Sequence, residues 1–149
     1  MRAINHALTG AVIGIASGNA WLAVPVALAS HFALDAIPHY GDGHTEPDGP
    51  SFTYTLIIDG LVCIVLVIVL ASWQPMHWQL AAVCAFLATS PDLMWIGRYR
   101  NARRGLKPPK FNPLMRFHSQ IQWFQRPVGA VVEMAWGVGI AWLLYAIGR

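Results

Sequence analysis

Histidine and carboxylate residues placed in apolar segments are the residues of this chain that could do chemistry. They lie near the ends of hydrophobic stretches, not in the middle: His6, His31, Asp35, Asp59, Asp92 and Glu133. An ionisable side chain in lipid is costly, so such residues are candidates for a functional site by default. If the stretches cross a bilayer as argued below, all six lie on the same side. A cluster of imidazoles and carboxylates there favours a metal site.

The sequence SHFALDAIPHY is the sharpest element of the chain. Its His31 and Asp35 are four residues apart, so they share a helix face and could supply two ligands to one metal ion. Pro38 disfavours continuing the helix, so His39 should turn into the next loop, where it could fold back as a ligand or be solvated. The structural alternatives are a hydrogen-bonded core histidine for His31 and a carboxylate that reaches water for Asp35.

A second candidate element is Ser90-Pro91-Asp92, which predicts a helix restart. Serine would cap the helix, proline would take the first helical position and aspartate would lie in the first turn. This structural account explains Asp92 as well as metal ligation does. His118 is the histidine between the basic segment and the last hydrophobic stretch, and it could complete the site.

Asp59 and Glu133 are the two candidates for a catalytic role, either as the general base or as further ligands. Asp59 lies in the most lipophilic stretch, and Glu133 has glycines four residues before and after it. Zinc suits mixed histidine and carboxylate ligands, and manganese is an alternative. The predicted cofactor is therefore a divalent metal, zinc first, and the predicted ligands are His6, His31, Asp35, His39, Asp92 and His118.

The composition excludes an ordinary water-soluble protein. Of the 149 residues, 56% are hydrophobic and 11% are charged, whereas soluble domains average about 25% charged residues. The length is that of a single domain. Cys63 and Cys84 lie inside apolar runs without CxxC spacing, which is typical of small core residues and not of a disulfide or a ligand pair.

The predicted fold is an all-α, polytopic membrane bundle of about five helices, with a short N-terminal helical hairpin. Eight of the ten lysines and arginines fall between Arg98 and Arg126, so this segment should be cytoplasmic and the N-terminus with it. The predicted location is the inner (cytoplasmic) membrane of a bacterium. The alternatives are one helix over residues 7–30 and a cleaved signal peptide over residues 1–23. The predicted helices lie near residues 3–17, 21–37, 54–73, 77–97 and 127–147, with cytoplasmic loops 38–53 and 98–126.

Small residues predict how the N-terminal hairpin packs. Gly10, Gly14 and Gly18 form two successive GxxxG steps, which allow membrane helices to approach closely. The matching small faces on the second helix are the pairs Ala23/Ala27 and Ala29/Ala33. Close packing of this hairpin would bring His6 near Asp35.

These motifs resemble the bacterial membrane-bound metal-dependent hydrolase family, also described as LexA-binding, inner-membrane-associated hydrolases. The resemblance rests on Asn-His-Ala-Leu-Thr-Gly at residues 5–10, Ser-His-Phe-Ala-Leu-Asp-Ala-Ile-Pro-His at residues 30–39, a Pro-Asp and a later His-Ser. The family's Pro-Asp-x-Asp-His element is reduced here to Pro-Asp-Leu-Met-Trp. The resemblance implies a small polytopic membrane protein with a divalent-metal site, and it points to His6, His31, Asp35, Asp92 and His118.

The leading functional hypothesis is a membrane-embedded metal-dependent hydrolase of a phosphoester or lipid-linked substrate, with its site at the cytoplasmic face. The predicted partners are the bilayer and an anionic phospholipid or phosphoester substrate steered by the basic segment; no nucleic acid is expected. One alternative is an ion or proton transporter component, although the outer halves of the spans offer no polar residues for such a path. Another is a non-catalytic scaffold stabilised by metal.

Overall fold

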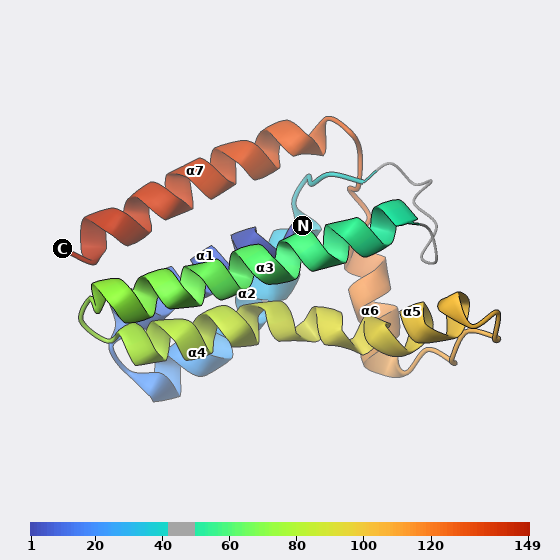
Figure 1. Ribbon diagram of the computed structural model, residues 1–149, viewed down its shortest axis with the longest axis horizontal. Helices are drawn as coiled ribbons and strands as arrows, with labels where there is room; N and C mark the ends of the chain where they lie inside the picture. Colours follow the sequence, from blue (N-terminus) through green and yellow to red (C-terminus); the bar gives the residue numbers. More distant parts are fainter. Residues whose placement is uncertain (42–49) are drawn as a thin grey trace.

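The computed structural model describes residues 1–41 and 50–149, and this part of the chain is all-helical. Eight helical segments follow one another in Figure 1: α1 (Ala3–Ser17), α2 (Ala20–Ala36), α3 (Pro50–Trp73), α4 (Trp78–Thr89), the 3-10 helix η1 (Ser90–Trp95), α5 (Ile96–Arg103), α6 (Pro113–Ile121) and α7 (Gly129–Ile147). The predicted loop 38–53 lies partly outside the described residues.

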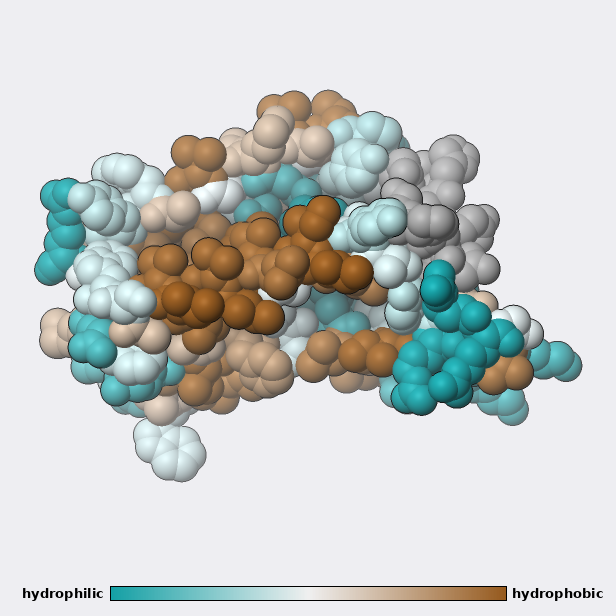
Figure 2. Space-filling view, viewed as in Figure 1, coloured by the Kyte–Doolittle hydropathy of each residue, from teal (hydrophilic) through white to brown (hydrophobic). Residues whose placement is uncertain are grey.

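Three segments are long and apolar enough to cross a membrane: Thr53–Trp73, Trp78–Arg103 and Gly129–Ile147. The first exposes a continuous set of large aliphatic side chains, and Figure 2 shows them as an apolar band along α3. Such a surface is typical of a helix that faces lipid. The chain is therefore built to associate with a membrane, and α1 and α2 are shorter apolar helices beside these three segments.

The glycines of α1 pack against α4, which corrects the prediction that they meet α2. A Cβ atom added at Gly10 would overlap the backbone carbonyl of Cys84, and one at Gly14 would lie 2.6 Å from Cα of Ala81. Ala23 and Ala27 of α2 are buried against Cys84 too, whereas Ala29 and Ala33 are exposed. The small residues thus bring both helices of the hairpin onto α4, because α4 offers a backbone that they can approach closely.

The fourth predicted helix, residues 77–97, is instead three consecutive helical segments that extend to Arg103. α4 passes into η1 and then into α5, so one rod runs on to Arg103 (Figure 1). Ser90 does not cap a restarted helix; its hydroxyl donates to the carbonyl of Leu87 at 2.9 Å, back into α4. The segment predicted as loop 98–126 contains the end of α5 and the whole of α6.

The turns at one end of the bundle come together, as the predicted threading requires. A Cβ atom at Gly18, after α1, would lie 2.7 Å from Nε2 of His77, after α3. At the same end the ring of Tyr145 in α7 stacks on that of Trp73, with centroids 6.1 Å apart. The opposite end therefore receives the start of α1, the end of α2 and the segments around η1 and α6.

Candidate metal centre

The end of α2 supplies the first two groups of the candidate centre. His31 and Asp35 lie one helical turn apart, with Nε2 of His31 3.3 Å from Oδ2 of Asp35. Both side chains are buried, at 0% and 1% exposure. The helix ends at Ala36, one residue before the Ile37-Pro38 pair, as proline chemistry predicts. The predicted shared face of His31 and Asp35 is present.

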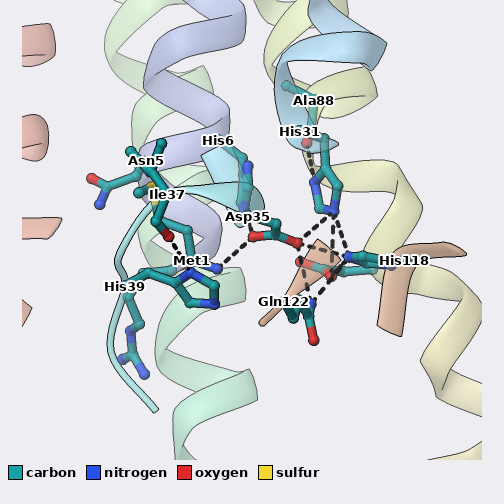
Figure 3. A network of polar contacts seen from close by, with 12 residues as sticks. Met1, Asn5, His6, His31, Asp35, Ile37, His39, Ala88, His118 and Gln122 are labelled. Carbon is teal, nitrogen blue, oxygen red and sulfur yellow. Dashed lines mark hydrogen bonds and ion pairs between the residues drawn. The ribbon is translucent and has the colours of Figure 1, made fainter. Parts of the chain in front are cut away.

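The third group is His118, which α6 carries to the same point. Asn112 caps this helix by accepting from the backbone N–H of Met115, and Pro113 occupies its first turn. Nε2 of His118 lies 2.7 Å from Oδ2 of Asp35 and 3.1 Å from Nε2 of His31 (Figure 3). His118 is fully buried. Two segments more than 80 residues apart in the chain therefore meet at one carboxylate oxygen.

Asp92 in η1 is the fourth group. Its Oδ1 lies 3.7 Å from Nε2 of His31 and 3.8 Å from Nε2 of His118. Its side chain is 39% exposed, so it forms the accessible side of an otherwise buried group. Asp92 lies in the first turn of η1, and η1 packs against α2, which brings this carboxylate near His31.

Together these residues form a group that could hold a metal ion. One donor atom from each of His31, Asp35, Asp92 and His118 lies within 4.8 Å of the others. A tetrahedral ion with ligands at about 2.0–2.1 Å places its donors about 3.3–3.4 Å apart. The five separations given above range from 2.7 to 3.8 Å and bracket that value. Two imidazoles and two carboxylates also balance the charge of a divalent cation.

Hydrogen bonds to the outer ring nitrogens fix different tautomers for the two histidines. Nδ1–H of His31 donates to the carbonyl of Ala88 at 2.8 Å, which leaves Nε2 with its lone pair facing the group. Nδ1 of His118 instead accepts from the indole N–H of Trp95 at 3.3 Å, so the neutral ring carries its proton on Nε2. His31 is thus ready to bind a metal, whereas His118 must first lose or move a proton.

His6 lies beside the group, on the other oxygen of Asp35. Its Nε2 is 3.2 Å from Oδ1 of Asp35, and its ring stacks on that of His31 with centroids 4.1 Å apart. His6 is fully buried, and apart from the ion-pair contact of Nε2 with Asp35 neither ring nitrogen has a hydrogen-bond partner among the described residues. The amine of Met1 also lies 2.5 Å from Oδ1 (Figure 3). The prediction that the hairpin brings His6 near Asp35 is confirmed, although the helices pack differently from the prediction.

His39 is buried but is not one of the four clustered residues. It leaves the helix after Pro38, as predicted, and its backbone pairs with Gln125. Nδ1–H donates to the carbonyl of Ile37 at 2.8 Å, and Nε2 has no hydrogen-bond partner among residues 1–41 and 50–149. Burial is the largest of the effects that lower the pKa of His39 below its ordinary value. Ligation by His39 stays a prediction.

The structure does not bring Asp59 and Glu133 into the group of four; Arg2 holds both. The Arg2 side chain pairs with Asp59 at 3.2 Å, and its backbone N–H donates to Oε1 of Glu133 at 2.7 Å. A carboxylate in an apolar helix needs such a partner. The two residues tie the start of α1 to α3 and α7. Their catalytic roles stay predictions.

Sequence analysis missed two residues that contact the site, Gln122 and Trp95. Nε2 of Gln122 lies 3.2 Å from Oδ2 of Asp35 and 3.1 Å from Nε2 of His118. Gln122 lies four residues after His118, so helical spacing could have found it. The contact of Trp95 with His118 could not be predicted in this way, because a tryptophan at a helix end is also typical of the membrane interface.

The chain was compared with protein-family models, with curated proteins and with solved structures, and none of them matches it. The geometry of the site therefore carries the functional argument.

Proposed function

We propose that this protein is a membrane-embedded, metal-dependent hydrolase of phosphoesters. The observation that carries the proposal is that one atom from each of three buried residues, His31, Asp35 and His118, and a carboxylate oxygen of the more exposed Asp92 lie within 4.8 Å of one another. The resemblance to membrane-bound metal-dependent hydrolases points to these four residues and to His6. The class of protein proposed is thus a polytopic metallohydrolase with its site at one end of the bundle.

In this proposal the three buried residues His31, Asp35 and His118 hold the ion, and zinc is the first choice for this donor set. A bound divalent ion supplies Lewis acidity, which lowers the pKa of water toward about 7. Asp92 lies on the exposed side of the group, where water and a substrate could reach it. Asp92 orients the attacking water and receives its proton. The water oxygen would bond to phosphorus as the bond between phosphorus and the ester oxygen breaks, and Asp92 would pass the proton it received to that leaving oxygen, which gives the alcohol.

Metal analysis of the purified protein is the first test. We expect about one divalent ion per chain, and we expect a chelator to remove it, lower the melting temperature and abolish release of phosphate from a phosphoester. Protein that is free of stoichiometric metal, with melting unchanged by chelator, would contradict the proposal.

Two isosteric variants then separate the candidate bases. Asp92→Asn should retain the metal and lose about 100-fold or more in kcat, the usual size of a general-base effect. Asp59→Asn should keep the metal and most of the activity, because Asp59 is paired with Arg2 away from the cluster. The reverse result would assign the base to Asp59.

A further inference from the structure

A groove beside the candidate metal centre opens between two of the segments that are apolar enough to span a membrane. It has a volume of about 800 Å³, within the range of small-molecule sites. One wall is α3, and the other is formed by η1 and the start of α5. Figure 2 shows a recess between the apolar side chains of α3 and those of this second rod.

The lining of the groove includes both apolar and polar side chains. The apolar part includes Leu56 of α3, with Leu93 and Ile96 on the facing rod, all 44–51% exposed. The polar part includes Asp92, which belongs to the candidate metal centre, and Gln122, which contacts Asp35 of that centre. A molecule lying in the groove would therefore have a hydrophobic portion between the helices and a polar portion beside the cluster.

Arg98 provides a positive charge at the polar part. Its guanidinium lies 5.3 Å from the centre of the Phe111 ring, which holds it in place by a cation–π contact. Within the described part of the chain no carboxylate forms an ion pair with it, whereas Arg2, the other arginine of the groove, is paired with Asp59. Arg98 is therefore the cation that is available to an anionic group.

We infer that the groove admits a single membrane lipid with a phosphate-ester headgroup, which enters sideways from the bilayer. The acyl chain lies between α3 and η1, and the phosphate lies between Arg98 and the metal centre. The inference rests on the proposed function for the chemistry at the centre, but it concerns binding and can be tested without turnover. Both walls belong to apolar spans, so the substrate need not leave the bilayer to reach the site.

Gly60 allows the groove to be closed from within. It lines the groove, and a Cβ atom added there meets no atom within 4 Å. Gly139 of α7 is a matched control, since it is equally open but does not line the groove. Gly60→Phe should fill the space that the acyl chain needs, whereas Gly139→Phe should point into the surrounding lipid or detergent.

The first test compares two substrates that share one ester bond. Phosphate release is measured from phosphatidic acid in mixed micelles and from glycerol 3-phosphate in the same micelles, with the full chain loaded with zinc. We expect kcat/KM to favour phosphatidic acid by about 100-fold or more, equivalent to roughly 2.7 kcal/mol. Gly60→Phe should lower this preference by about tenfold, and Gly139→Phe should leave it unchanged. Equal use of both substrates, or a preference that Gly60→Phe does not alter, overturns the inference.

The second test measures lipid binding itself, so that the two proposals can fail separately. Native mass spectrometry should detect retained phosphatidic acid in preference to phosphatidylcholine. Gly60→Phe and Arg98→Gln should lose this preference, whereas Arg100→Gln, a change at an exposed arginine of the same helix, should keep it. Selective, Gly60-dependent retention without any phosphate release supports the groove and contradicts the hydrolase. Retention that ignores the headgroup or the two groove variants overturns the groove.

Discussion

Both ends of the bundle contain histidine, but in different surroundings: one is the end of the Gly18 and His77 turns, here called the turn end, and the other is the end of the candidate metal centre, here called the cluster end. At the turn end, His77 is exposed beside Gly18, and no carboxylate in the described part of the chain forms an ion pair with it. At the cluster end, His31 is fully buried and lies within 4 Å of two carboxylates. Burial with oppositely charged partners, and not the presence of histidine, distinguishes a candidate site from a surface residue.

The largest effect should come from removing the negative charge of Asp35, which three histidines of the cluster end contact. Asp35 contacts His31 and His118 through one oxygen and His6 through the other. Asp35→Asn should weaken metal binding by at least about 100-fold, and it should destabilise the fold by about 3 kcal/mol, because buried partners lose their counter-charge. Metal content and melting temperature measure both effects.

Replacement of a polar residue by asparagine at the turn end is the control for Asp35. His77→Asn should leave the metal content unchanged and the melting temperature within a degree or two, because the side chain is exposed. If both variants bind metal as the wild type does, Asp35 is not needed for metal binding.

The second effect should come from the contact that holds α1 in place. Gly14→Val would put a branched side chain against the backbone of Ala81, so α1 must move away from α4. Overpacking of this kind costs about 1–3 kcal/mol or more, and it also displaces His6. Gly139→Val is the control, since the space around Gly139 is open. Unfolding in graded detergent mixtures measures both; equal losses would mean that α1 does not depend on this close approach.

Local patterns predicted the parts of the site that lie within one helix. The spacing of His31 and Asp35 and the stop at Pro38 depend on the chain within one or two turns, so periodicity and proline chemistry suffice. Membrane class followed from composition in the same way. The apolar spans are correspondingly close to those predicted: residues 54–73 against Thr53–Trp73, and residues 127–147 against Gly129–Ile147.

Packing between distant segments was beyond these patterns. Gly10 and Gly14 correctly predicted a close contact between helices. A row of small residues does not identify the partner helix, however, and these glycines pack against α4 instead of α2. Arg2 was not among the predicted site residues, although it partners the two carboxylates that were predicted to be catalytic. These pairings depend on the three-dimensional arrangement of α3 and α7 around α1, which no local spacing encodes.

A smaller effect should distinguish the two histidines within the cluster end. Because Nδ1 of His118 accepts from the Trp95 indole, binding of a metal at Nε2 requires a proton to move to Nδ1, against that hydrogen bond. Trp95→Phe removes the opposing donor, so metal affinity should rise by about threefold to tenfold, the worth of one hydrogen bond. Trp123→Phe, at a residue 71% exposed, should leave the affinity unchanged. Titration with zinc in competition with a chelator measures this; a weaker affinity in Trp95→Phe would show that the indole supports the site.

The smallest effect should be a pH dependence at His39. Burial lowers the pKa of this imidazole below its ordinary value of 6.5, so the folded chain binds fewer protons there than the unfolded chain. Stability must then rise with pH up to about 6.5 and level off above it. His39→Gln removes this contribution, so the rise in the free energy of unfolding between about pH 5 and pH 6.5, followed by melting, should become shallower by less than about 1.4 kcal/mol per pH unit. The measurement is made with excess chelator, so that protons do not compete with metal. His77→Gln should keep the wild-type slope, because His77 is exposed in the fold; a slope that changes equally in both variants would remove the distinction between the two ends for this histidine.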